Sequence, residues 1–126
     1  MNGVLVDTSV WVAHFRRENK GLVYLLERDR VIVHPMVIGE LACGTPPNRA
    51  HILVDLDSLH HSQQATLKET LDFVESEKLY GLGCGLVDML LLASTMMTRR
   101  TDLWTLDKRL SALAERFGVM HRPTTH

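Results

Sequence analysis

Short apolar runs that lack polar alternation constrain the fold of this chain more than any other feature. They are rich in β-branched or bulky residues, and they lie at residues 4–6, 31–33, 103–106 and, more weakly, 119–120. A strand with one face in water alternates apolar and polar residues, whereas a strand covered on both faces is apolar throughout. These runs therefore predict the buried strands of a parallel sheet.

Helical patterns fill the sequence between these runs. Pro35 suits the first turn of a helix, because its missing N–H is not needed there, and Ile52, Leu53 and Leu56 form part of an amphipathic stripe. The patterns predict helices over residues 10–15, 22–27, 35–43, 48–59, 64–77, 86–98 and 108–117. Strands that alternate with helices indicate an α/β fold. The length of 126 residues suits a single domain over residues 1–126.

Charge and cysteine content exclude several classes of protein. Fourteen Lys and Arg residues stand against 15 Asp and Glu residues, a formal net charge of −1, which excludes affinity for nucleic acid through bulk positive charge. Cys43 and Cys84 are too few for a disulfide scaffold or a thiolate zinc site. No signal peptide is evident, and the longest apolar run, residues 86–97, is shorter than the ~20 residues of a membrane span. We therefore expect a reduced, cytoplasmic protein with no membrane partner.

Four carboxylates occupy positions that indicate a metal site. Asp7 and Asp107 each follow a strand-like run, and Glu40 and Asp88 have apolar neighbours in the sequence. Open parallel sheets bind ligands beyond the carboxyl ends of their strands. Acids brought together there repel one another and resist losing water, so a cation is needed to keep them ionised. Oxygen ligands favour Mg²⁺ or Mn²⁺, and either ion can activate water for hydrolysis of a phosphodiester.

Each acid also has an ordinary structural interpretation. Asp7 and Asp107 can cap the helices that follow them, and Asp88 can favour the dipole in the first turn of its helix. Glu40 can be a partly exposed helix residue. Asp55 has apolar neighbours on both sides, and it illustrates that such a context does not make an acid a ligand. Spacing alone leaves both interpretations open.

Four segments make the sequence similar to a known family. They nearly span the chain, in the family's order: LVDTSVW, HPMVIGELACG, GLGCGLVDMLLLAS and LWTLDKRL. The chain resembles PIN-domain ribonucleases and, among them, the VapC-type toxins of type II toxin–antitoxin systems. The resemblance implies a three-layer α/β/α PIN-like fold with a central parallel sheet and an acidic pocket for Mg²⁺ or Mn²⁺. It places the family's catalytic, metal-binding acids on Asp7, Glu40, Asp88 and Asp107.

The resemblance also implies an activity. VapC-type toxins are metal-dependent endoribonucleases, in which water attacks phosphorus in a structured RNA such as a tRNA or an rRNA loop, and cleavage inhibits translation. Thr8 or Ser9 would lend a hydroxyl near the metal or the phosphate, and Thr105 occupies the hydroxyl position that often precedes the fourth acid. Close relatives often carry His two residues after the third acid. This chain has Leu90 there, so no imidazole is expected at that position.

Basic side chains are the candidates for contacts with RNA phosphates. They form three groups along the chain: Arg16, Arg17 and Lys20; Arg99 and Arg100; Lys108 and Arg109. Among them we expect Arg16, Arg17 and Lys108 to bind substrate. Each group can equally consist of solvated residues at helix ends, favoured there by the helix dipole.

The resemblance implies two protein partners. VapC-type proteins form homodimers, and a cognate VapB-type antitoxin inactivates them. The apolar stripes at residues 22–26 and 48–59 can form the groove that receives the antitoxin. The alternative function is a catalytically silent PIN-like module that binds RNA or an antitoxin. A receiver-like phosphoacceptor domain is disfavoured, because the run at 31–33 ends in His34 and Pro35 rather than in a phosphorylatable Asp.

Overall fold

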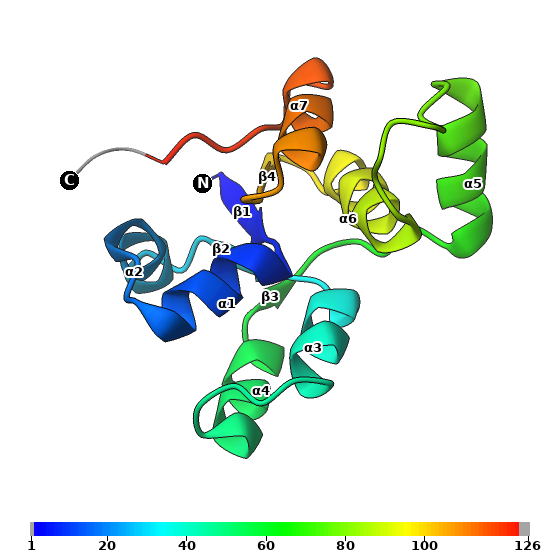
Figure 1. Cartoon of the computed structure of the whole chain (residues 1–126). Helices are drawn as coiled ribbons and strands as arrows, with labels where there is room; N and C mark the ends of the chain where they lie inside the picture. The colour runs from blue at the N-terminus through cyan, green and yellow to red at the C-terminus, as the bar shows by residue number, and fades with distance from the viewer. Residues whose placement is uncertain (1, 124–126) are drawn as a thin grey trace.

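A parallel sheet of four strands forms the centre of the structure, a computed structural model that describes residues 2–123 (Figure 1). The strands are β1 (Gly3–Val6), β2 (Val31–Val33), β3 (His60–His61) and β4 (Thr101–Trp104). Their order across the sheet is β3-β2-β1-β4, and every neighbouring pair is parallel. The predicted α/β class and parallel sheet are therefore confirmed.

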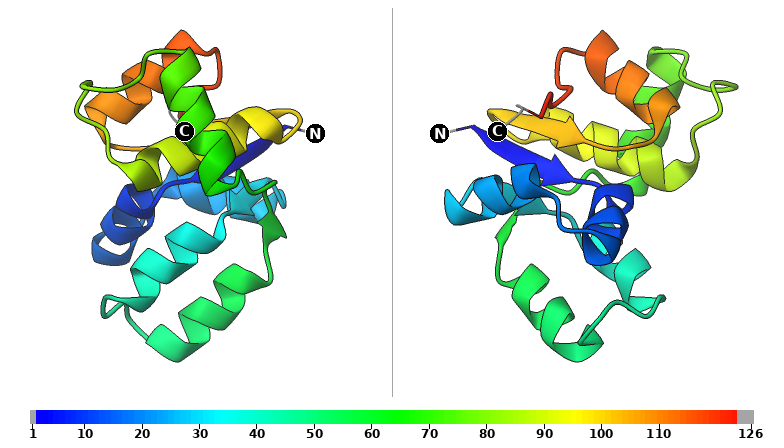
Figure 2. Two further views of the ribbon diagram at one scale, coloured as in Figure 1. Left: turned by 90° about the vertical axis from the view of Figure 1, so that its right-hand side faces the viewer. Right: turned by 60° about the vertical axis from the view of Figure 1, so that its left-hand side comes forward.

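Helices cover both faces of this sheet. They are α1 (Thr8–Arg16), α2 (Lys20–Glu27), α3 (Pro35–Ala42), α4 (Arg49–Asp57), α5 (Leu67–Ser76), α6 (Leu86–Met97) and α7 (Lys108–Arg116). In the right-hand view of Figure 2, α1 to α4 lie below the sheet and α5 to α7 lie above it. Crossovers between parallel strands are right-handed, so reversing the direction of travel along the sheet sends the helices to the opposite face. The predicted three-layer α/β/α architecture is confirmed.

The strands are buried on both faces, which explains their apolar composition. Val4, Leu5 and Val6 of β1 have no exposed surface. Leu22 of α2 and Leu92 of α6 join them in the core. None of the helices within residues 2–123 is long and apolar enough to cross a membrane.

The strand order reverses between β1 and β4. From β1 the chain moves to β2 and β3 on one side, and it then returns through α5 and α6 to place β4 on the other side of β1. Val6 is in register with Trp104, and the Asp7 N–H donates to the Trp104 carbonyl oxygen across 2.9 Å. Open α/β sheets bind ligands in the crevice beyond such a reversal. The carboxyl ends of β1 and β4 therefore mark the expected position of a site.

The last strand lies two residues earlier than the sequence predicts. It covers Thr101–Trp104 rather than residues 103–106. Thr105 leaves the strand because its hydroxyl donates to Asp7 Oδ2 across 2.7 Å, and Leu106 is exposed. The prediction that an acid directly follows this strand is therefore wrong.

Two further differences concern short β segments. The run at 119–120 contributes only an isolated bridge, between Leu103 and Met120. The sequence does not predict β3, because its two exposed histidines carry no apolar signal. The helices, in contrast, agree with the predicted ranges to within three residues at every end.

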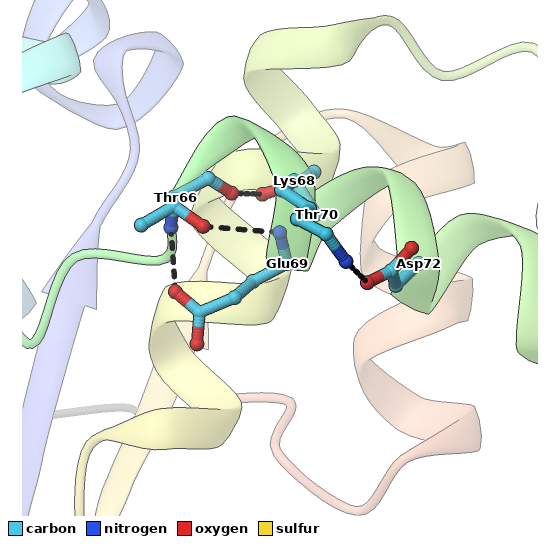
Figure 3. A network of polar contacts seen from close by, with 5 residues as sticks. All are labelled: Thr66, Lys68, Glu69, Thr70 and Asp72. Carbon is cyan, nitrogen blue, oxygen red and sulfur yellow. Dashed lines mark hydrogen bonds and ion pairs between the residues drawn. The ribbon is translucent and has the colours of Figure 1, made fainter.

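A reciprocal cap fixes the start of α5 (Figure 3). Thr66 Oγ1 accepts from the Glu69 N–H across 3.0 Å, and Glu69 Oε1 accepts from the Thr66 N–H across 2.9 Å. This capping box satisfies N–H groups that have no partner within the helix. Lys68 and Asp72 form an ion pair on the same helix, with both side chains largely exposed.

A buried histidine caps α3. His34 Nδ1 accepts from the Met36 N–H across 3.0 Å, and Nε2 lies 3.1 Å from Ser94 Oγ on α6. Burial, and then the charge of His61, lowers the pKa of His34. Because Nδ1 accepts, the neutral ring carries its proton on Nε2, and protonation of Nδ1 would remove the cap.

Loss of the capping box should destabilise the protein. We expect Thr66→Ala to lower the free energy of unfolding by about 1 kcal/mol, because the Glu69 N–H loses its acceptor. Lys68→Ala is the matched control, since an exposed i,i+4 ion pair contributes only about 0.3–0.5 kcal/mol. Urea denaturation of the two variants measures both changes, and equal losses would contradict the prediction.

Stability should also depend on His34. The unfolded chain takes up a proton below the ordinary histidine pKa of 6.5, whereas folded His34 excludes it until its lower pKa is reached. The free energy of unfolding should therefore fall as the pH drops below 6.5. His34→Asn keeps a capping side chain, and it should weaken this dependence between about pH 7 and 5. Denaturation at several pH values measures the slope, and identical slopes for both proteins would refute the prediction.

Candidate active site

Asp7 stands at the point where β1 and β4 end. Its side chain is buried, and Oδ2 accepts two hydrogen bonds of 2.7 Å, from Ser9 Oγ and from Thr105 Oγ1. Asp7 occupies the N-cap position of α1, yet its side chain makes no capping hydrogen bond. The interpretation of Asp7 as a side-chain helix cap is therefore wrong, and hydroxyls from two segments fix its orientation instead.

The two hydroxyls tie the ends of the strands together. Ser9 Oγ and Thr105 Oγ1 lie 3.4 Å apart, and Ser9 Oγ accepts from the Leu106 N–H across 3.0 Å. Thr105 Oγ1 accepts from the Asp107 N–H across 3.1 Å. This network shapes the loop between β4 and α7 around the Asp7 carboxylate.

Asp107 caps α7. Its Oδ1 accepts from the Leu110 N–H across 2.9 Å, so the capping interpretation of this acid is confirmed. The residue is exposed and follows the end of β4 by three positions. Its second carboxylate oxygen takes no part in the cap.

Asp88 lies in the first turn of α6. Its Oδ2 accepts from the Gly85 N–H across 3.2 Å, which closes the start of the helix. Partial burial raises the pKa of Asp88, and the negative charges of Asp7 and Asp107 raise it further, against the opposing effect of the Gly85 hydrogen bond. Two acids from separate segments therefore act electrostatically on Asp88.

Glu40 is linked to this group through Thr8. It is an exposed residue of α3, and its Oε1 accepts from Thr8 Oγ1 across 2.6 Å. Thr8 directly follows Asp7, so this bond links Glu40 to the loop that carries the buried acid. Glu40, Thr8 and Arg16 line a pocket of about 420 Å³ that extends to Pro47.

The basic candidates occupy different settings. Arg16 is in the last turn of α1, where the dipole favours a cation, and Arg17 is exposed beyond it. α7 begins at Lys108, so Lys108 and Arg109 stand at the positive end of a helix. The interpretation that the dipole favours these two residues is therefore wrong.

The donor set fits a hard divalent cation bound partly through water. Within residues 2–123, no three Asp, Glu, His or Cys side chains form a group that could hold a metal by themselves. Mg²⁺ needs fewer than that, because it is usually held by one or two carboxylates and keeps several waters. None of the ion pairs within the described residues involves Asp7, Glu40, Asp88 or Asp107. These four acids therefore have no direct cationic partner among the described residues.

A close contact that the sequence does not predict borders this cluster. Gly83 has a φ of +88°, and its backbone packs against the Arg109 side chain. In the sequence, Gly83 is one of three alternating glycines, Gly81, Gly83 and Gly85, that separate two predicted helices. This pattern indicates a break between the helices and does not indicate a contact with Arg109. The contact itself depends on the tertiary fold.

The chain is similar to known proteins over most of its length. A model of the PIN domain family matches residues 4–116. Two curated relatives named Ribonuclease VapC32, from Mycobacterium tuberculosis strains CDC 1551 / Oshkosh and ATCC 25618 / H37Rv, are each 42% identical over 116 residues, covering 92% of this chain and 94% of the relative. The resemblance seen in the sequence is thereby confirmed. This chain belongs to the PIN-domain family, as a VapC-type member.

Proposed function

We propose that this protein is an endoribonuclease toxin that depends on Mg²⁺ or Mn²⁺. One observation carries the proposal: at the strand-order reversal the charges of Asp7 and Asp107 act on Asp88, and none of the three acids forms an ion pair within the described residues. The relatives' printed name, which calls them ribonucleases, supports it. Hydrolysis of an RNA phosphodiester is the reaction that best uses such a site.

Each acid has a role in this proposal. Asp7 and Asp88 are the principal ligands, Asp107 holds a coordinated water through the carboxylate oxygen that does not cap α7, and Glu40 orients water or binds a second ion. When bound, the cation activates water as a nucleophile and offsets the charge that grows on the phosphate. Both hydroxyls that bind Asp7 use Oδ2, so they aim the carboxylate and leave Oδ1 for the cation.

The proposed substrate is a structured RNA of translation, a tRNA or an rRNA loop, and the proposed result is inhibition of translation. Cleavage would leave a 5′-phosphate and a 3′-hydroxyl. The VapC-type resemblance supports this target. The alternative, a silent module, predicts binding of RNA or antitoxin without cleavage.

An apolar groove supports a VapB-type antitoxin as partner. It has a volume of about 280 Å³ and lies between α1, α2 and α4, where Trp11, Leu26 and Ile52 are among the lining residues. Leu25, in contrast, is only 3% exposed and belongs to the core, so it is a poor candidate for this groove.

A second copy of the chain is the other proposed partner. Large apolar side chains are exposed on α5 and on the segment that leads into α6: Leu67, Leu71, Tyr80, Leu82 and Leu86. In Figure 1, α5 projects at the edge of the molecule. Exposed apolar groups gathered in this way favour a protein interface, and a homodimer would cover them.

Removal of either principal ligand should abolish cleavage. We expect Asp7→Asn and Asp88→Asn to lower the cleavage rate by about 100-fold or more, because charge stabilisation of several kcal/mol is lost. EDTA should stop cleavage by the unaltered protein, and Mn²⁺ or Mg²⁺ should restore it. Mapping of 5′ ends in total RNA measures the activity.

Asp55→Asn is the matched control for this experiment. Asp55 is an exposed acid of α4 that contacts His51, and its replacement should leave the rate unchanged. Activity that survives EDTA or both ligand substitutions would refute the mechanism. RNA binding without any cleavage by the unaltered protein would favour the silent module.

The antitoxin groove has its own test. We expect Ile52→Ala to weaken binding of the cognate VapB-type antitoxin by about tenfold, because a partly buried apolar contact is lost. Val54→Ala on the same helix is the matched control, since Val54 is 69% exposed and does not line the groove. Titration calorimetry measures both affinities, and equal effects of the two substitutions would place the antitoxin elsewhere.

A further inference from the structure

Gly83 forms a close-fitting cradle for the side chain of Arg109. A Cβ atom on Gly83 would lie 2.7 Å from both Cδ and Nη1 of Arg109 and 2.9 Å from Nε. Those distances are shorter than van der Waals contact, and the φ of +88° is one that other residues rarely adopt. Glycine therefore allows the guanidinium to lie directly on the backbone, in a position from which a Cβ atom would displace it.

The cradle places Arg109 beside the acid cluster. Arg109 is the second residue of α7, two positions after Asp107, and Gly83 leads into the helix of Asp88. Cys84 directly follows Gly83. Burial raises the pKa of its thiol, and the negative charges of Asp88 and Asp107 raise it further, whereas the positive charge of Arg109 lowers it. The guanidinium and these carboxylates therefore act on the same small region.

Arg109 forms no direct ion pair within the described structure, although acids lie nearby. None of the ion pairs within residues 2–123 includes it. Its place in the first turn of α7 is also unfavourable, because the helix N-terminus carries positive charge of its own. The guanidinium donors of Arg109 therefore have no direct partner within the described residues, and an anionic ligand would supply one.

We infer that Arg109, held by Gly83, binds a non-bridging phosphate oxygen of the RNA at the edge of the acid cluster. The inference rests on the proposed ribonuclease function and assigns the site a substrate-binding residue. The planar guanidinium of Arg109 can donate two parallel hydrogen bonds to phosphate oxygens. This cation would draw an anionic substrate toward a pocket whose own charge is negative.

Kinetics on an RNA hairpin oligonucleotide with a single-stranded loop test the assignment. We expect Arg109→Gln to raise KM about tenfold, with a smaller effect on kcat, and to reduce the slope of log affinity against log salt by about 0.7. Arg109→Lys keeps the positive charge but lacks the planar pair of donors. Its salt slope should therefore equal that of the unaltered protein, whereas its affinity should lie between those of the unaltered protein and Arg109→Gln. Gly83→Ala should change KM in the same direction as Arg109→Gln, because it displaces a guanidinium that is still present.

Arg116→Gln is the matched control. Arg116 lies at the far end of α7, where it donates to the Glu77 carbonyl oxygen, and its replacement should leave KM and the salt slope unchanged. The assignment is wrong if the unaltered protein cleaves RNA and Arg109→Gln binds the same RNA with equal affinity and an equal salt slope.

Binding in EDTA separates this failure from failure of the proposed function. If the unaltered protein does not cleave, fluorescence titration of the same oligonucleotide still measures the contribution of Arg109. Affinity that falls in Arg109→Gln and not in Arg116→Gln would support the contact without catalysis. Absence of RNA binding by the unaltered protein would overturn the assignment.

Discussion

The parallel pairing of β1 with β4 is the contact on which the site depends. It joins segments far apart in the chain: Asp7 and Thr105, 98 positions apart, share a hydrogen bond of 2.7 Å. Because β1 lies between β2 and β4, its carboxyl end opens onto the crevice where the helices pass to opposite faces. The first turn of α6 carries Asp88, and the loop between β4 and α7 carries Asp107. Without this pairing, Asp7 would be an isolated acid at the end of a strand.

Charge in this crevice works against the folded protein. The carboxylates have no ion-pair partner within the described residues, and burial together with Asp7 and Asp107 raises the pKa of Asp88. Neutral residues would fold more readily at these positions, since like charges in partly buried surroundings repel and lose hydration. Functional sites commonly retain such local destabilisation. Hydroxyls from Ser9 and Thr105 relieve a part of it at Asp7, since each donates to its carboxylate.

The sequence predicts elements that depend on local pattern and misses those that depend on tertiary contact. Apolar runs and helical stripes predict the three-layer order. Positions after predicted strands, and positions with apolar neighbours, indicate the same four acids as the family's motif does. The end of β4 is misplaced because the Thr105 hydroxyl bonds to a residue 98 positions away. No local signal reveals the contact of Gly83 with Arg109. The dipole argument at Lys108 failed for a different reason: the predicted helix over residues 108–117 already begins there, and the dipole favours a cation only at the other end of a helix.

The double use of Asp107 affects how variants of this acid are interpreted. One carboxylate oxygen caps α7 by accepting from the Leu110 N–H. The other takes no part in the cap and is the one proposed to hold a coordinated water. Replacement by alanine would remove both functions at once, so a loss of activity could report a frayed helix rather than a missing carboxylate. Asparagine retains a comparable acceptor for the helix and lacks the negative charge. Asp107→Asn therefore separates the contribution of this residue to catalysis from its contribution to folding.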